Sequence, residues 1–190
     1  MKKLIKIYLK TKNPETLHDI RVQARATLAN LAQQNKTDLY LKKLLKISSK
    51  VRDIDVLKKI CNSKKIIKYL TKVQKKEMKN LITYLNNYKS KIVYQKTKKI
   101  SHKKCKKICK KNFLNKNDKQ LHKIRIQIKK CRYALKLEKL KTLQTILGDI
   151  HDLYNCIKIK KEFHLSYKKE KKLKKRLILY ANKKRKKICK

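Results

Sequence analysis

The stretch "LHKIRIQIKKCRYALKLE", residues 121–138, carries the pattern that decides the fold. Its apolar residues recur at intervals of three and four positions: Leu121, Ile124, Ile128, Cys131 and Leu135. This spacing predicts an amphipathic helix with one buried stripe. The segment before it supplies a start signal, because Asn117 followed three residues later by Gln120 resembles a capping box.

A second copy of this pattern lies in the first half of the chain. "LHDIRVQARATLANL", residues 17–31, begins with the same Leu-His-x-Ile-Arg-x-Gln sequence as the opening stretch. Further along each half, "RDIDVL" aligns with "HDLYNC", so that Asp53 matches Asp152. Landmarks that return in the same order predict an internal repeat. Within a single domain over 1–190, the repeats are expected at about 10–100 and about 117–188.

Each half is expected to hold about four helices. In the first half, Asn13 can cap a helix and Pro14 suits its first turn. Further helices are expected over 38–47, over 52–60 with Asp53 and Asp55 in its first turn, and over 66–85. The basic residues 86–117 are expected to end one helix and connect the halves. In the second half, Gly148 is expected to end a short helix over 140–147, followed by helices over 149–163 and 171–184.

Composition favours an all-α fold. The 190-residue chain has one Gly and one Pro, which is too few for the many tight turns of an all-β protein. Hydrophobic residues make up 41% of the sequence, enough for a core, so disorder of the body of the chain is not expected. We expect two pseudo-symmetric four-helix bundles that enclose a basic groove.

The charge of the chain restricts its partners. Lys and Arg number 59 against 12 acidic residues, which gives a formal net charge of +47. Cations at this density repel one another and attract polyanions. The candidate partners are therefore nucleic acid, an anionic membrane surface or a polymeric phosphate. A coding bias toward Lys, Ile and Asn accounts for part of the excess.

The start of the chain and its cysteines predict a cytosolic protein. Lys interrupts "MKKLIKIYLKTK", so no signal peptide is expected, and no stretch approaches a membrane span. The six cysteines are accordingly expected to be reduced thiols. His102, Cys105 and Cys109 fall on one helical face and could bind zinc with Cys131 as a fourth ligand. We favour the interpretation that these cysteines are scattered reduced residues of a basic helix, so no metal or other cofactor is expected.

A stripe of His, Arg and Lys runs beside the buried face of each copy. In the first copy it consists of His18, Arg21 and Arg25; in the second of His122, Arg125, Lys129 and Arg132. At about 100° per residue these side chains lie next to the apolar stripe, at the edge of a helix–helix groove. The chain has 52 Lys and only seven Arg, yet five of the seven Arg lie in the repeated landmarks. Arg offers a planar fork that holds phosphate oxygens through two hydrogen bonds, which Lys cannot reproduce.

Structural explanations compete with this interpretation. Each His could be a core residue that donates to a carbonyl or to an Asp of another helix. The Arg stripe could form ion pairs with the scarce acids Asp53, Asp55, Asp149 and Asp152. Such acids could also orient the Arg side chains toward a ligand. Twelve acids cannot neutralise 59 cations, however, so most of the positive charge must face outward.

The repeated L-H-x-I-R motif, together with "LQTILGDIHDL" and "VRDIDVL", resembles the CHAD family, the conserved-histidine α-helical domains. The resemblance covers residues from about 10 to 185. It implies two four-helix bundles related by a pseudo-two-fold axis with a basic cavity between them. It also implies binding of inorganic polyphosphate, and association with polyphosphate granules in some members. The chain is short for the family, and Leu28 stands where the second copy has Arg132.

The resemblance assigns the binding residues by motif. They would be His18, Arg21, Arg25, Arg52, His122, Arg125, Lys129 and Arg132. The chain lacks the E-x-E-x-K strand of the triphosphatase domains that often accompany this family, and its "DID" and "DIHD" clusters are explained by helix starts. We therefore expect a non-catalytic, cytoplasmic polyphosphate-binding protein. A general nucleic-acid-binding protein that acts by charge alone is the alternative, and a phosphate-hydrolysing enzyme is the third possibility.

Overall fold

The computed structural model describes residues 1–96 and 100–188. Within these residues the chain folds into eight α-helices, one 3-10 turn and a two-stranded sheet, which confirms the all-α prediction. The chain divides into two compact units, Met1–Lys99 and Ile100–Lys190, and each is described by itself. None of the helices in the described residues has the length and apolar character needed to cross a bilayer. The groove expected between two repeats stays a prediction.

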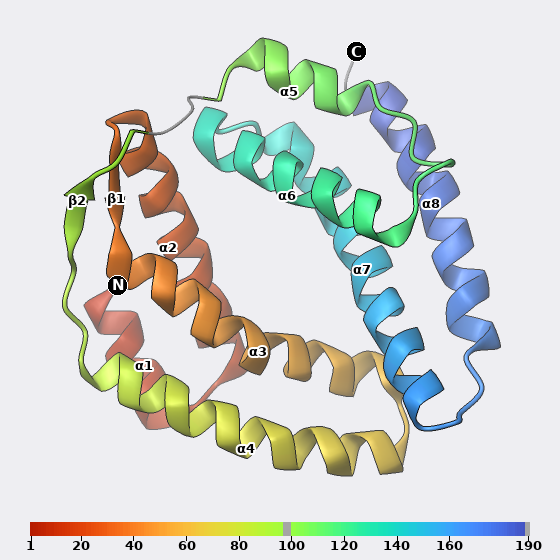
Figure 1. Ribbon diagram of the computed structural model, residues 1–190, viewed down its shortest axis with the longest axis horizontal. Coiled ribbons are helices and arrows are strands. Elements are labelled where there is room, and N and C mark those ends of the chain that lie inside the picture. Colours follow the sequence, from red (N-terminus) through yellow and green to blue (C-terminus); the bar gives the residue numbers. More distant parts are fainter. Residues whose placement is uncertain (97–99, 189–190) are drawn as a thin grey trace. The chain divides into compact units, whose positions relative to one another are not determined.

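The first unit consists of four helices and the small sheet (Figure 1). The helices are α1 (Lys2–Thr11), α2 (Pro14–Gln33), α3 (Leu39–Cys61) and α4 (Lys64–Asn86). Strand β1 (Lys36–Asp38) pairs antiparallel with β2 (Ile92–Tyr94). Consecutive helices pack against one another, and α1 also contacts α4. Their apolar faces meet in a core that includes Tyr8, Leu17, Leu44 and Leu81, all with no exposed surface.

Two polar side chains fix the starts of α2 and α3. Asn13 caps α2 as predicted, because its side chain accepts a hydrogen bond from the Glu15 amide at 2.8 Å. Asp38 caps α3 by accepting from the Leu41 amide, and its second oxygen accepts from the Ser90 hydroxyl at 2.6 Å. Asp38 is 2% exposed, so this carboxylate ties the start of α3 to the segment before β2 inside the fold.

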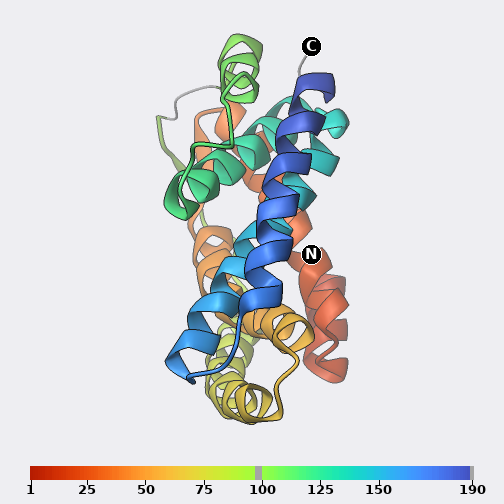
Figure 2. The same ribbon diagram turned by 90° about the vertical axis from the view of Figure 1, so that its right-hand side faces the viewer.

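The second unit contains four more helices (Figure 2). They are α5 (His102–Cys109), α6 (Asp118–Leu135), α7 (Lys141–Glu162) and α8 (Lys168–Ile188). Again consecutive helices pack together, and a 3-10 turn at Glu138–Leu140 joins α6 to α7. The capping box predicted at the start of α6 is present, with Asn117 and Gln120 each accepting from the backbone amide of the other.

Helix α5 is short, and several contacts hold its residues and the segment after it to the unit. Cys105 forms a disulfide with Cys131 of α6. Phe113, just after α5, is fully buried, and its amide donates to the Asn182 side chain of α8. Arg185 donates to the Lys110 carbonyl at 3.0 Å. The expectation of reduced thiols is therefore wrong for Cys105 and Cys131, and no cysteine in the described residues has a free thiol.

Several predicted boundaries are wrong because helices run through signals that were interpreted as ends. Helix α3 is continuous, so Asp53 and Asp55 lie in its second half and not in a first turn. Helix α7 runs through Gly148, which is buried in its interior. Residues 86–117 contain β2 and α5 in addition to the connection. Finally, α1 forms before Asn13, in a segment for which no helix was predicted.

The ends of several helices take up a left-handed conformation without glycine. Lys12 after α1, Asn62 after α3 and Lys136 after α6 have φ angles of 54°, 36° and 50°. Glycine usually occupies such positions, because other L-residues are strained there. The single glycine of the chain, Gly148, lies inside α7, so Lys and Asn residues adopt the left-handed conformation at these helix ends.

The interior position of Gly148 predicts the outcome of one substitution. Glycine inside a helix costs up to about 1 kcal/mol relative to alanine. A Cβ at this position would lie 3.6 Å from the nearest atoms, Nε and Nη2 of Arg125, which is ordinary contact. Gly148→Ala should therefore raise the free energy of unfolding by about 0.5–1 kcal/mol in urea denaturation. A loss of stability would indicate that the residue ends a helix after all.

The Cys105–Cys131 disulfide predicts a second effect on stability. The two cysteines are 26 residues apart, and a loop of that size stabilises the folded state by about 3.5 kcal/mol in the chain-entropy account. The double variant Cys105→Ala/Cys131→Ala should lose roughly that amount under non-reducing conditions, measured by urea denaturation followed by circular dichroism. An unchanged midpoint would show that the bond does not constrain the unfolded chain.

Candidate functional site

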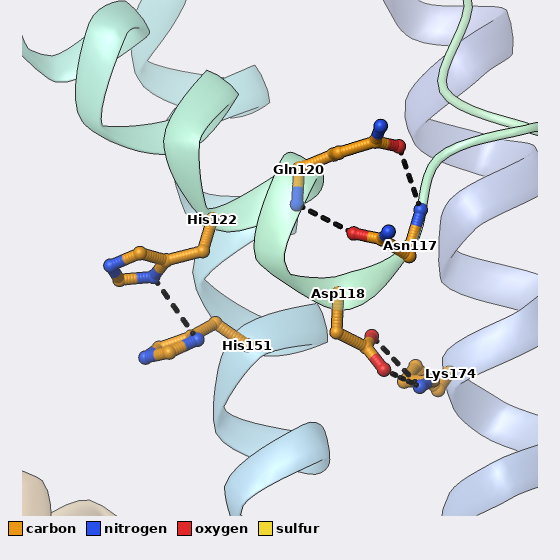
Figure 3. A network of polar contacts seen from close by, with 6 residues as sticks. All are labelled: Asn117, Asp118, Gln120, His122, His151 and Lys174. Atoms are coloured by element: carbon orange, nitrogen blue, oxygen red, sulfur yellow. Dashed lines mark hydrogen bonds and ion pairs between the residues drawn. The ribbon is translucent and has the colours of Figure 1, made fainter.

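Two histidines from neighbouring helices form the centre of the site in the second unit. The Nδ1 atoms of His122 on α6 and His151 on α7 lie 3.2 Å apart, and their ring centroids are 4.2 Å apart (Figure 3). Burial, and then the charges of His122 and Arg125, lower the pKa of His151 to about 4. His151 is therefore neutral at pH 7, and one of the two Nδ1 atoms donates while the other accepts.

Asn155 determines which nitrogen of His151 carries the hydrogen. Its Nδ2 atom lies 3.3 Å from His151 Nε2. An amide nitrogen can only donate, so His151 Nε2 accepts and its hydrogen lies on Nδ1. That hydrogen points to His122 Nδ1, which must accept. The hydrogen of a neutral His122 is then on Nε2, the nitrogen that faces away from His151 (Figure 3).

Arg125 lies on the surface of α7 at its only glycine. The position that a Cβ of Gly148 would occupy is 3.6 Å from both Nε and Nη2 of Arg125. The Nε atom is buried and has no hydrogen-bond partner within the described part of the chain. Arg125 also acts on Asp149: burial raises the pKa of this carboxyl, and the guanidinium charge opposes the rise. The end of the Arg125 side chain thus lies against α7, and its Nε–H has no acceptor among the described residues.

Arg132 is held at the end of the same stripe by Glu138. Its Nη2 atom lies 3.2 and 3.1 Å from the two oxygens of Glu138, and its Cζ lies 5.2 Å from the Tyr133 ring centroid. The Arg132 side chain is 15% exposed, but that of Glu138 is 69% exposed. An ion pair with one partner so exposed is weak, because water screens it. A stronger anion can therefore replace the Glu138 carboxylate.

The first unit presents a related but different arrangement. Helix α2 carries His18 at its exposed edge, and partial desolvation followed by the Arg52 charge lowers the pKa of this histidine. Arg52 on α3 also pairs with Glu15 at 3.4 Å. Arg25 is half-buried on α2. His18 on α2 and Arg52 on α3 are close enough to interact electrostatically, so these two residues of the predicted site lie near each other within the unit.

Arg21 is the predicted residue whose position differs most from the expectation. It is 7% exposed, and its Nη1 donates to the Leu45 carbonyl at 2.9 Å and to the Ser48 hydroxyl at 2.5 Å. Ser48 in turn donates to the Leu44 carbonyl. Arg21 therefore ties α2 to α3 through a carbonyl and a hydroxyl, a structural role of the kind that competes with the binding interpretation of the stripe.

His151 and Asn155 are the residues that sequence reasoning missed. The alignment that matches Asp53 to Asp152 also matches Arg52 to His151. In each unit the residue at this position interacts with the repeated histidine, Arg52 with His18 and His151 with His122. The sequence signal for His151 is its place in "HDLYNC", directly before the Asp that aligns with Asp53.

The candidate zinc ligands have a different role in this structure. Cys105 and Cys131 are joined to each other, so their sulfurs are not thiolates available to a metal. Among the described residues, no three His, Cys, Asp or Glu side chains are grouped so that they could hold a metal ion. The spacing of His102, Cys105 and Cys109 is instead the spacing of an amphipathic helix that buries both cysteines.

Comparisons of the chain with models of known protein families, with curated proteins and with solved structures give no match. The interpretation of the site therefore depends on its own geometry. That geometry consists of Arg side chains held against neighbouring groups and of the His122–His151 contact, with the Asp118 and Asp149 carboxylates close enough to interact with His151 and Arg125 respectively.

The histidine pair predicts a measurable pH dependence. In the unfolded chain His151 should titrate near 6.5, whereas its folded pKa is about 4. The unfolded state therefore binds more protons between these values, and the folded state loses stability as the pH falls through this window. An NMR pH titration should place His151 near 4. His122→Ala should raise this pKa, whereas Lys158→Ala on the exposed side of α7 should not. A wild-type value near 6.5 would contradict the prediction.

Proposed function

We propose that this protein binds inorganic polyphosphate without catalysing its hydrolysis. The observation that carries the proposal is the fixed cationic edge of α6, where Arg125 lies on Gly148 and His122 is oriented by His151. The proposed binding residues are His122, Arg125, Lys129 and Arg132 in the second unit, and His18, Arg25 and Arg52 in the first. Arg21 is proposed to position α2 rather than to contact the ligand, because its guanidinium is used inside the fold.

The mechanism combines long-range attraction with short-range geometry. Binding of a linear polyanion to a chain of net charge +47 releases condensed counterions, which supplies most of the affinity and makes it depend on salt. The Arg forks add oriented hydrogen bonds to phosphate oxygens. Phosphate displaces the exposed Glu138 from Arg132 and Glu15 from Arg52, since it carries more charge and more acceptors.

Protonation of the histidines is coupled to this binding. Burial first, and then the neighbouring cations, lower the pKa of His18 and of His151 in the protein without ligand. A bound phosphate chain reverses the sign of the nearby charge and favours the protonated imidazole. Polyphosphate affinity should therefore increase as the pH decreases from 7 toward 6, in the opposite direction to the stability of the protein without ligand.

The resemblance to the CHAD family supports the same proposal. Each unit has four α-helices in which consecutive helices pack, and the matched positions 18 and 52, and 122 and 151, interact in their own unit. We propose on this basis that the units are pseudo-symmetric repeats of a CHAD-like domain. A cytoplasmic protein associated with polyphosphate granules is the cellular setting that this function implies.

General binding of nucleic acid is the second candidate, favoured by the net charge alone. It needs no oriented fork, so it predicts that every cation of similar exposure contributes equally. Arg125→Ala would then cost no more affinity than Lys186→Ala on the exposed side of α8. The proposed function predicts a larger loss at Arg125.

A competition titration tests the proposal directly. Long-chain polyphosphate should displace duplex DNA from the protein at about 0.2 M salt, where non-specific DNA contacts weaken. Arg125→Lys keeps the charge but removes the fork, and should reduce polyphosphate affinity by about tenfold, the effect of roughly one charge-assisted hydrogen bond. The matched control is Arg176→Lys on exposed α8, which should change the affinity little. Parallel loss of both ligands with salt, or equal effects of the two substitutions, would refute the proposal.

The non-catalytic part of the proposal has its own measurement. Phosphate release from polyphosphate and from nucleoside triphosphates should stay at the level of the buffer, with and without Mg²⁺ or Mn²⁺. Release that depends on either metal would replace the binding function with an enzymatic one.

A further inference from the structure

The outer edge of strand β2 is open in the first unit. Strand β1 packs against α2, and β2 pairs with β1 on the side away from α2 (Figure 1). The outer edge of a strand presents backbone N–H and C=O groups to which a further strand can pair. The hydrogen bonds between β1 and β2 show which residues of β2 carry these groups.

Ile92 and Tyr94 are the residues whose backbone groups point outward. The Leu39 amide donates to the Lys91 carbonyl at 2.9 Å, and a bond of 2.8 Å joins the two strands at the other end of the ladder. Hydrogen-bonded and non-hydrogen-bonded pairs alternate along antiparallel strands. In this register Ile92 and Tyr94 occupy the non-hydrogen-bonded positions toward β1. Their N–H and C=O groups have no hydrogen-bond partner in residues 1–96 and 100–188.

The side chains at these two positions are apolar and exposed. Tyr94 is 74% exposed, the highest value among the large hydrophobic side chains in the described part of the chain, and Ile92 is 56% exposed. Because side chains alternate along a strand, both lie on one face of β2, and Val93 points to the other. An apolar strand edge with unpaired backbone groups is a template for the addition of a further strand.

The charges at this edge determine the kind of strand that fits. Lys89, Lys91 and Lys96 are exposed in the segment that contains β2, whereas Asp38, the acid within the sheet, is buried. A second copy of this chain would be repelled, because its net charge is also +47. A phosphate polymer has no amide groups that could pair with a strand. A peptide strand with acidic side chains supplies both the backbone groups and the opposite charge.

We propose that the outer edge of β2 binds an extended segment of another protein in which apolar and acidic residues alternate. The backbone of this segment pairs with the N–H and C=O groups of Ile92 and Tyr94, and its apolar side chains lie beside theirs. Its acidic side chains lie on the other face, near Lys91. This binding does not depend on the proposed polyphosphate stripe.

Amide hydrogen exchange measured by NMR tests this assignment, with an acetylated and amidated peptide of four Val-Glu repeats as the probe. In the free protein the amides of Ile92 and Tyr94 should exchange rapidly. The peptide at about 0.15 M salt should slow their exchange by about tenfold or more, because pairing protects both amides. The Val93 amide, which points toward β1, should be protected with and without the peptide.

A modified peptide separates strand pairing from attraction by charge. The same peptide with N-methylated valines keeps its charge and its apolar side chains but loses the amide donors of those residues. It should bind roughly tenfold more weakly, the effect of one or two hydrogen bonds. Equal affinity for the two peptides would show that only charge is recognised.

Variants of the protein supply the remaining controls. Ile92→Ser should weaken peptide binding about three- to tenfold, whereas Leu179→Ser, at a similarly exposed position of α8, should not. Tyr94→Pro removes an amide that β1 does not use, so it should abolish binding and leave the fold intact. Arg125→Lys should leave peptide binding unchanged, so that failure of the polyphosphate proposal would not affect this one.

Three further results would overturn the assignment. They are absence of peptide binding, binding without protection of the Ile92 and Tyr94 amides, and equal losses in Ile92→Ser and Leu179→Ser. Protection of these amides that rises with protein concentration alone would assign the edge to a second copy of the chain instead.

Discussion

Repulsion among its own cations is the constraint to which the rest of this structure responds. With a formal charge of +47, each helix must bury one apolar face and keep its lysines in water. The ion pairs present are mostly exposed on at least one side, such as Lys50–Glu77 and Arg132–Glu138, and relieve little of the repulsion. A bound polyanion would relieve far more of the repulsion, and its binding would then stabilise the folded state.

The two units differ in how the cations of the repeated motif are held in place by other groups. Arg21 and Arg125 occupy the same position of the repeated motif, but Arg21 is used to join α2 to α3, whereas Arg125 lies along α7 with its Nε unpaired. The repeated histidines differ in the same way: His18 is coupled to an arginine and His122 to a neutral histidine. The second unit therefore has the more preorganised cationic edge, in line with the missing cation at Leu28 of the first.

Capping residues predicted the starts of α2 and α6 correctly, whereas the helix starts predicted at residues 52 and 149 and the helix end predicted at Gly148 were wrong. Asn13 and the Asn117–Gln120 box determine their helices through contacts within four residues, which a sequence shows directly. The stop predicted at Gly148 failed because burial of Ile146, Leu147 and Ile150 on one face outweighs the modest helix penalty of one glycine. His151 and the Cys105–Cys131 bond depend on contacts between helices, which no spacing rule reveals. The stripe is visible in the sequence because Arg is rare against a background of Lys, but the contacts of Arg21 with α3 arise from packing between helices and have no signal in the sequence.

The left-handed helix ends at Lys12, Asn62 and Lys136 also affect the unfolded state. Side chains at these positions strain the folded backbone, yet they also restrict the unfolded backbone more than glycine would. A chain with one glycine in 190 residues is thus unusually stiff when unfolded, and it gives up less conformational entropy on folding. This smaller entropy cost of folding offsets part of the destabilisation that charge repulsion causes in the folded state.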